Sequence, residues 1–276
     1  MLVRRRVLTV LSAALAVVVL SSSPAVADAG PPPSSMASLG DSITRGFNAC
    51  GWYSDCPSRS FSTGDNSYVY SHYLRIRAIN PNINGRNYND AKTGAKSSAM
   101  YGQASTAVSQ GVQYVTMLIG ANDACTSTEA GMTPVSTYRA NIDAGLNRIK
   151  AGLPNARVFV ISVPDIHRLW FIGYNNASAR EAWYWFGICQ SMLANPTSFA
   201  QADIDRRARV RQRVIDYNTQ LAQACAAYGS YCKFDNNTLF NYPFTLSHMA
   251  TWDFFHPNEL GQKVLASQSY AVGFGW

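Results

Sequence analysis

Residues 36–42 read MASLGDS, and they combine a short buried strand with a polar turn. The small and apolar residues 36–39 predict a strand that stops at Gly40, and Asp41 and Ser42 follow at once. Two longer apolar runs, residues 112–119 (VQYVTMLI) and 157–163 (RVFVISV), predict further buried strands. Uninterrupted apolar strands of this kind are typical of a parallel sheet that is covered on both faces.

Segments with helical spacing alternate with these strands. Helices are expected at 68–79, 97–110, 134–153, 203–228 and 258–270, and weaker strands at 85–91 and 233–234. Asn258 is placed to cap the last helix. Strands that alternate with helices predict the α/β class, here a three-layer α/β/α sandwich around a central parallel sheet.

The first 27 residues have the organisation of a secretory signal peptide. Three arginines (residues 4–6) precede an apolar run at 7–20, and Ala25-Val26-Ala27 supplies a small-residue cleavage site. The alternative is a membrane anchor, but the run is shorter than the roughly 20 residues that a bilayer span needs. We therefore expect a secreted, extracellular protein that begins near Asp28, with residues 28–276 as a single domain.

Composition and charge argue against two classes of protein, nucleic-acid-binding and disordered. Once the signal arginines are removed, 20 basic residues face 16 acidic ones, so the net charge is only +4. A charge this small predicts no nucleic-acid partner. With 47% hydrophobic and 14% charged residues, the chain is not of the disordered type. We expect a monomer.

Six cysteines remain after residue 27, an even number that favours disulfides in an exported protein. Fifteen pairings are possible. Short loops close at low entropic cost, which favours Cys50–Cys56 and Cys225–Cys232 and leaves Cys125–Cys189. No metal site is expected, because there is no CxxC pair and the four histidines are scattered.

The residues that follow the predicted strands supply the parts of a nucleophilic active site. Ser42 follows the first strand, and a serine hydroxyl needs an adjacent base to become a nucleophile. His256 is the best base, and Asp253, three residues earlier, can orient its imidazole through a tight turn. The carboxyl ends of parallel strands meet at one edge of a sheet, so these segments are expected to converge there.

Attack on an ester carbonyl produces an oxyanion, which needs fixed hydrogen-bond donors. The backbone N–H groups of Ser42 and Gly94 and the side-chain amide of Asn122 can supply three. Glycine at position 94 lets the backbone approach a substrate without a Cβ in the way.

Together these blocks resemble the SGNH (GDSL-type) hydrolase family. The resemblance rests on SLGDSI at 38–43, Gly94, GAND at 120–123 and DFFHP at 253–257, and it extends over residues 36–270. It implies a flavodoxin-like fold, a Ser–His–Asp site without a cofactor, and an oxyanion hole made by Ser42, Gly94 and Asn122. Ile43 occupies the position of the leucine in the GDSL motif. Some members of the family use a Ser–His dyad instead of a triad. No G-x-S-x-G motif occurs, which argues against the α/β-hydrolase fold.

The substrate is less defined. The blocks NACGWYSDCPSR and VPDIHRLW resemble secreted actinobacterial family members that act on lipids, including phospholipase A1-type enzymes. They imply a lipid-acyl esterase. A polysaccharide acetyl esterase of the same fold, and a non-catalytic secreted protein that binds lipid or sugar, stay open as alternatives.

Two further segments bear on lipid contact. The aromatic residues of segment 165–200 could form an acyl pocket or a surface that enters lipid, or they could be core beneath a disulfide-linked insert. The basic run 206–213 (RRARVRQR) could meet anionic head groups, but such a run is more often a solvated helix face.

Overall fold

Five parallel strands form the central sheet of this computed structural model, which describes residues 29–276. In chain order the strands are β1 (Met36–Gly40), β2 (Asn87–Asn89), β3 (Tyr114–Leu118), β4 (Arg157–Val160) and β5 (Cys232–Phe234). Their spatial order is β2-β1-β3-β4-β5, the flavodoxin-like arrangement. The predicted signal peptide, residues 1–27, lies outside the described residues.

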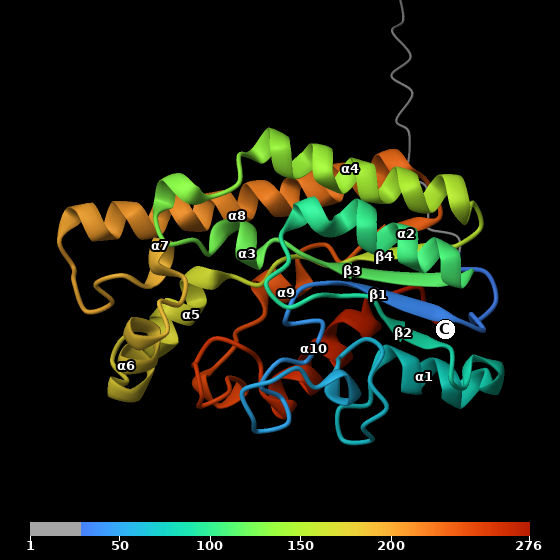
Figure 1. Ribbon diagram of the computed structural model, residues 1–276, viewed down its shortest axis with the longest axis horizontal. Coiled ribbons are helices and arrows are strands. Elements are labelled where there is room, and N and C mark those ends of the chain that lie inside the picture. The colour runs from blue at the N-terminus through green and yellow to red at the C-terminus, as the bar shows by residue number, and fades with distance from the viewer. Residues whose placement is uncertain (1–28) are drawn as a thin grey trace, which may run out of the picture.

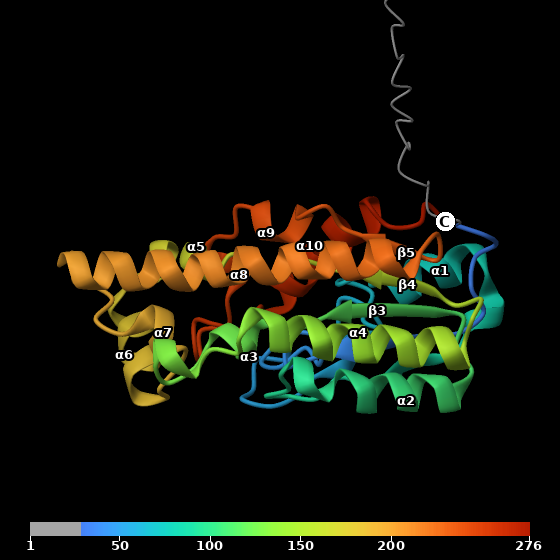
Figure 2. The same ribbon diagram turned by 90° about the horizontal axis from the view of Figure 1, so that it is seen from above.

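Helices cover both faces of the sheet, as Figure 1 shows. One face carries α2 (Met100–Gln110), α4 (Val135–Gly152) and α8 (Gln201–Tyr228), which run alongside one another in Figure 2. The other face carries α1 (His72–Ile79) and α10 (Glu259–Ala271). Every residue of β1 and β3 is buried between these layers. The predicted three-layer α/β/α sandwich is confirmed.

The predicted elements are present, with some changes at their ends. The helix expected at 68–79 begins only at His72, because Tyr70 has a positive φ of 50° and the Ser71 hydroxyl accepts a hydrogen bond from the Leu74 N–H. The expected cap of α10 is confirmed, since Asn258 Oδ1 accepts from the Gly261 N–H at 2.9 Å.

The aromatic segment contains three helices that its irregular pattern did not predict: α5 (Ile166–Gly173), α6 (Ala177–Trp185) and α7 (Gln190–Leu193). They extend beyond the carboxyl ends of the strands (Figure 1). Trp170 and Trp183 are buried, whereas Tyr184, Trp185 and Phe186 are exposed. The segment is therefore partly core and partly surface, and no single period describes it.

Three disulfides join the cysteine pairs that the sequence favours: Cys50–Cys56, Cys125–Cys189 and Cys225–Cys232. The second one attaches the aromatic segment, at the residue before α7, to the chain just after the short helix α3 (Ala121–Ala124). Within residues 29–276, no helix combines the length and apolar character needed to cross a bilayer.

Candidate active site

Ser42 lies two residues beyond β1, at the carboxyl edge of the sheet, and only 4% of its surface is exposed. The sharp turn that places it depends on Gly40, which has a φ of +155°. A Cβ at this position would clash with the Leu118 carbonyl oxygen and the Thr44 hydroxyl. Glycine therefore allows β1 to lie against β3 and still turn into Ser42.

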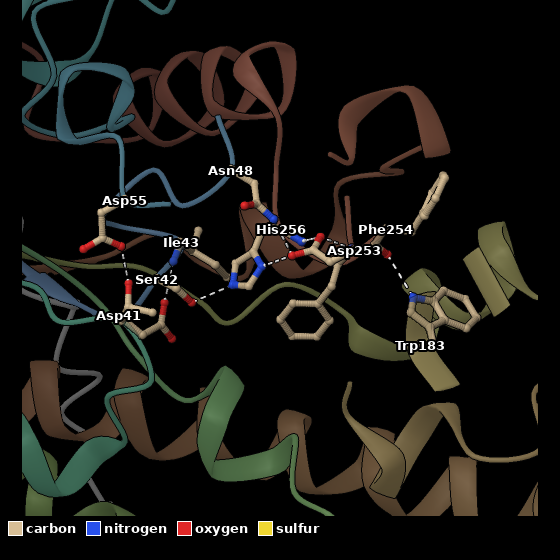
Figure 3. Close-up of polar contacts among 11 residues, drawn as sticks. Asp41, Ser42, Ile43, Asn48, Asp55, Trp183, Asp253, Phe254 and His256 are labelled. Atoms are coloured by element: carbon tan, nitrogen blue, oxygen red, sulfur yellow. Dashed lines mark hydrogen bonds and ion pairs between the residues drawn. The ribbon is translucent and has the colours of Figure 1, made fainter. Parts of the chain in front are cut away.

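Ser42, His256 and Asp253 form a continuous hydrogen-bonded row (Figure 3). Ser42 Oγ lies 2.8 Å from His256 Nε2, and His256 Nδ1 lies 2.5 Å from Asp253 Oδ2. A carboxylate can only accept, so Nδ1–H donates to Asp253 and Nε2 accepts from the serine hydroxyl. This is the tautomer that a general base at His256 requires.

Asp253 is held rigidly from several sides. Its side chain is almost fully buried, and its Oδ1 accepts from the backbone N–H groups of Phe255 and His256 at 2.9 and 3.0 Å. On the other oxygen, Asn48 Nδ2 donates to Oδ2 at 2.6 Å (Figure 3). Asn48 is buried and adopts a φ of +66°, a conformation that asparagine tolerates better than most residues. Sequence reasoning missed Asn48, because nothing in its local pattern indicates a partner 205 residues away.

The turn that carries Asp253 and His256 is closed by backbone bonds and by the aromatic segment. The Ala250 N–H donates to the His256 carbonyl oxygen at 2.8 Å. Between them, Phe254 has a φ of +48°, which is costly for a bulky residue. Trp183 of α6 donates its indole N–H to the Phe254 carbonyl oxygen at 3.2 Å (Figure 3). The buried part of the aromatic segment thus supports the turn.

Hydrogen bonds link the two other predicted oxyanion donors to the Ser42 turn. The Lys92 N–H donates to the Gly40 carbonyl oxygen at 3.2 Å, and Asn122 Nδ2 donates to the Ala95 carbonyl oxygen at 3.0 Å. Gly94, between these two anchors, has a φ of +78°. Within the described part of the chain, the N–H groups of Ser42 and Gly94 donate to no other residue, and Asn122 Nδ2 carries a second hydrogen. Each of the three predicted donors therefore keeps an N–H that binds no other described residue.

Two buried side chains that sequence reasoning missed cross-link these segments. Asp123 accepts from the N–H and the hydroxyl of Ser97 at 2.8 and 2.7 Å. Gln103 of α2 accepts from the Gly40 N–H at 2.7 Å and donates to the Gly40 carbonyl oxygen at 2.9 Å. Asp123 stands within the predicted GAND block, but its structural role was not predicted.

Asp41, next to Ser42, is fully buried. Its Oδ1 accepts from the Ile43 N–H at 2.9 Å, while Oδ2 has no hydrogen-bond partner among the described residues. Burial raises the pKa of this carboxyl to about 7, partly offset by the hydrogen bond from Ile43 and by the charge of His256. A titratable group thus lies next to Ser42, the predicted nucleophile, without belonging to the Ser–His–Asp row.

A small apolar cavity of about 60 Å³ is lined partly by the segments that carry the site, although Ser42, His256 and Asp253 are not among its lining residues. Its wall includes direct chain neighbours of three site residues: Ile43 follows Ser42, Ala121 precedes Asn122, and Phe255 precedes His256. The remaining lining comes mainly from α5 and from the residues after β4, including Val163, Leu169 and Ile172, and Phe244 and Leu265 of α10 add to it. This carbon-rich space fits an apolar group better than a sugar.

The remaining histidines lie outside the row. His72 is buried between the Tyr114 hydroxyl and Ser269 Oγ, at 3.0 and 2.7 Å, and burial lowers its pKa to about 3. It is a structural, uncharged histidine. In residues 29–276, no group of three or more His, Cys, Asp or Glu side chains is arranged to hold a metal ion.

The basic run on α8 is not a free cationic surface. Its arginines bind within the protein: Arg206 to Asp203, Arg209 to Glu129 and Arg211 to Asp165, while Arg213 donates to the Thr133 carbonyl oxygen. Arg207 is buried and stacks over Trp170 at 4.3 Å. Binding of anionic head groups by this helix was one of the two alternatives for the basic run. Because its arginines are already bound or buried, little of their charge is left to support that alternative.

The sequence profile described as GDSL-like Lipase/Acylhydrolase matches residues 36–269, which includes the whole sheet and all the residues of this site. The chain belongs to this family. The family assignment agrees with the resemblance seen in the sequence. It makes the chain a hydrolase of the lipase/acylhydrolase type. No curated protein sequence matches the chain.

Solved structures resemble this GDSL-family chain to different degrees. LAE5, described as an alpha/beta hydrolase enzyme from the metagenome of Lake Arreo, has a TM-score of 0.54 at 17% identity, over 87% of this chain and 94% of that one. An extracellular lipase from Streptomyces rimosus has a TM-score of 0.49 at 22% identity, over 86% and 97% of the two chains. Phospholipase A1 from Streptomyces albidoflavus NA297 has a TM-score of 0.48 at 17% identity, over 86% of this chain and 97% of that one.

Proposed function

We propose that this GDSL-family hydrolase is a secreted serine esterase that cleaves carboxylic esters of lipids, with a lipase or phospholipase A1-type activity. The observation that carries the proposal is the row in which Ser42 Oγ contacts His256 Nε2 and His256 Nδ1 contacts buried Asp253. In this arrangement the hydroxyl has a base within reach, and the base has an orienting carboxylate.

The first half-reaction forms an acyl-enzyme. Ser42 Oγ attacks the ester carbonyl carbon while its proton passes to His256 Nε2. The carbonyl oxygen becomes an oxyanion that accepts from the N–H groups of Ser42 and Gly94 and from the Asn122 amide. The intermediate then collapses, the bond from carbon to the alcohol oxygen breaks, and the imidazolium returns its proton to the leaving alkoxide.

The second half-reaction releases the acid. A water molecule takes the place of the alcohol and loses a proton to His256 Nε2 as it attacks the acyl carbon. Collapse of the second intermediate breaks the bond to Ser42 Oγ, which recovers its proton from His256. Asp253 stays ionised throughout and stabilises the imidazolium in both halves. The mechanism uses no cofactor.

An apolar acyl group is favoured by the cavity of about 60 Å³, whose wall includes the chain neighbours of Ser42, Asn122 and His256. Such a space contributes binding energy through removal of apolar surface from water. Secretion is favoured by the three disulfides and by the signal-like residues 1–27. We propose that residues 28–276 act as one domain and as a monomer.

A fluorophosphonate probe tests the nucleophile. The wild-type protein is expected to be labelled, and Ser42→Ala is expected to stay unlabelled. Labelling of Ser42→Ala would remove Ser42 from this role. No labelling of a folded wild-type sample would favour a non-catalytic lipid- or sugar-binding protein.

Product analysis tests the substrate class. The purified protein is incubated with phosphatidylcholine in mixed micelles, with a triacylglycerol emulsion and with acetylated xylan. Fatty acid release, from the sn-1 position for a phospholipase A1, is the expected result. Acetate release from xylan without any fatty acid release would replace the lipid esterase by a polysaccharide acetyl esterase.

A further inference from the structure

Six large aromatic side chains, 47–77% exposed, lie in segments next to the catalytic row. We call them the aromatic rim: Trp52, Tyr53, Tyr184, Trp185, Phe186 and Trp252. They come from three distant parts of the chain, namely the Cys50–Cys56 loop, the end of α6 and the turn before Asp253. Exposed apolar residues that gather from separate segments indicate an interaction surface.

Ring contacts connect the rim to the catalytic histidine. The centroid of the Phe47 ring lies 4.8 Å from that of the His256 ring and 5.0 Å from that of the Tyr53 ring. Tyr53 in turn stacks on Phe186 at 5.5 Å and lies 6.4 Å from Trp252. Three of the six rim residues, Tyr53, Phe186 and Trp252, are therefore linked by ring contacts to His256, and Tyr184 and Trp185 directly precede Phe186 in the chain.

The segments that carry the rim are fixed before any partner arrives. The Cys50–Cys56 disulfide closes the loop that carries Trp52 and Tyr53, and Trp252 Nε1 donates to the Gly51 carbonyl oxygen at 2.8 Å. On α6, buried Trp183 anchors the helix just before Tyr184. A rigid aromatic surface loses little conformational entropy when it binds.

Two lysines add positive charge beside the same site. Lys92 and Lys96 flank Gly94, are exposed, and take part in none of the ion pairs found among residues 29–276. Their loop touches the rim-bearing loop, since Thr93 Oγ1 donates to Asp55 Oδ1 at 2.5 Å. The arginines of α8, by contrast, are already bound within the protein.

We infer that the aromatic rim, together with Lys92 and Lys96, docks the enzyme on a lipid surface that carries anionic head groups. The inference rests on the proposed lipid esterase function and assigns it a surface. Trp and Tyr rings suit the boundary between water and acyl chains, and lysine ammonium groups are attracted to the negative potential of anionic lipid. Docking through this face brings ester groups of the lipid to Ser42 and acyl chains to the apolar cavity.

The test measures binding in the Ser42→Ala background, so that hydrolysis does not change the vesicles. Sedimentation with vesicles of phosphatidylcholine, with and without phosphatidylglycerol, gives the partition coefficient. Ser42→Ala is expected to bind both vesicle types and to bind the anionic ones more tightly. Replacing Tyr184, Trp185 and Phe186 by serine is expected to weaken binding to both roughly tenfold or more.

The lysines are tested separately. Lys92→Gln with Lys96→Gln is expected to weaken binding to anionic vesicles roughly tenfold and to leave binding to pure phosphatidylcholine nearly unchanged. Matched controls at the opposite edge of the sheet, where α1 leads into β2, are Ile79→Ser for exposed apolar surface and Arg86→Gln for charge. Both controls are expected to bind like the parent protein, and circular dichroism verifies that every variant is folded.

The outcomes separate this inference from the proposed function. If the wild-type protein hydrolyses soluble p-nitrophenyl butyrate but Ser42→Ala binds no vesicles, the docking surface is wrong and the esterase stands. If the rim variant binds as well as the controls, another surface is responsible and the rim is excluded. Retention on insoluble xylan without vesicle binding would assign the rim to sugar instead. Absence of any esterase activity would overturn the proposed function itself.

Discussion

The indole N–H of Trp183 donates a hydrogen bond to the carbonyl oxygen of Phe254, the residue that follows Asp253 in the turn leading to His256. A fully buried side chain of α6 thereby holds the turn that orients His256, the proposed catalytic base. Phe254 itself has a positive φ, so the turn needs this outside support.

Trp183→Phe removes this donor and leaves the Phe254 carbonyl oxygen without it. We expect a loss of about 1–3 kcal/mol in the free energy of unfolding and a lower kcat on a soluble ester. Trp170→Phe is the matched control, since Trp170 Nε1 donates to the Pro196 carbonyl oxygen at 2.8 Å in the same aromatic segment. Urea unfolding and steady-state kinetics compare the two. Equal effects on kcat would show that Trp183 contributes stability alone.

Asn48→Gly tests the support of Asp253 from the other side. Glycine accepts the positive φ at this position, so the variant removes the hydrogen bond to Asp253 Oδ2 without straining the backbone. Because a bond to a charged group is lost, we expect kcat to fall roughly tenfold with a small change in KM. Asn236→Gly, at an exposed position with a φ of +53°, should behave as wild type. An unchanged kcat in Asn48→Gly would deny Asn48 a positioning role.

Asp253→Asn distinguishes a triad from a dyad. If the new side-chain oxygen keeps its bonds from the Phe255 and His256 N–H groups, the new amide N–H₂ faces His256 Nδ1 and favours the wrong tautomer. We expect kcat to fall by roughly 10³–10⁴. Activity near that of the wild type would mean that Ser42 and His256 work as a dyad.

Asn122→Ala removes one of the proposed oxyanion donors. We expect kcat to fall by roughly 10²–10³ while KM changes little, because this donor acts on charge that develops only in the transition state. The Asn122 amide also bonds the Ala95 carbonyl oxygen at 3.0 Å, so thermal unfolding should accompany the kinetics. An effect on KM alone would exclude Asn122 from the oxyanion hole.

Asp41→Asn tests the buried carboxyl next to Ser42, the proposed nucleophile. Because its pKa is about 7 in the folded chain, against an ordinary value of 3.8 for an aspartate, the folded state binds the proton more tightly than the unfolded state. The stability linked to Asp41 is therefore present below about pH 4 and is lost as pH rises to about 7, by up to about 4 kcal/mol. Urea unfolding between pH 4 and pH 8 should show a smaller decline for Asp41→Asn than for wild type. Exposed Asp65→Asn is the control, and parallel curves for Asp41→Asn and wild type would refute the raised pKa.

The sequence by itself determined the α/β/α layers, because apolar runs and helical spacing report local burial. It also indicated the candidate residues Ser42, Gly94, Asn122, Asp253 and His256, because each follows a strand or precedes a helix in a recognisable block. It favoured the disulfide pairs found in the structure, two of them from short loop length.

Only the tertiary structure decided what supports those residues. Asn48 lies 205 positions from Asp253, and Trp183 lies 71 positions from Phe254, so no local pattern could join them. The same applies to the aromatic segment 165–200, where buried and exposed rings alternate without a period because the segment packs both against α8 and against distant loops. Ser42 was visible as a serine after a strand, but the contacts that hold its base in place arise from packing between segments far apart in the chain.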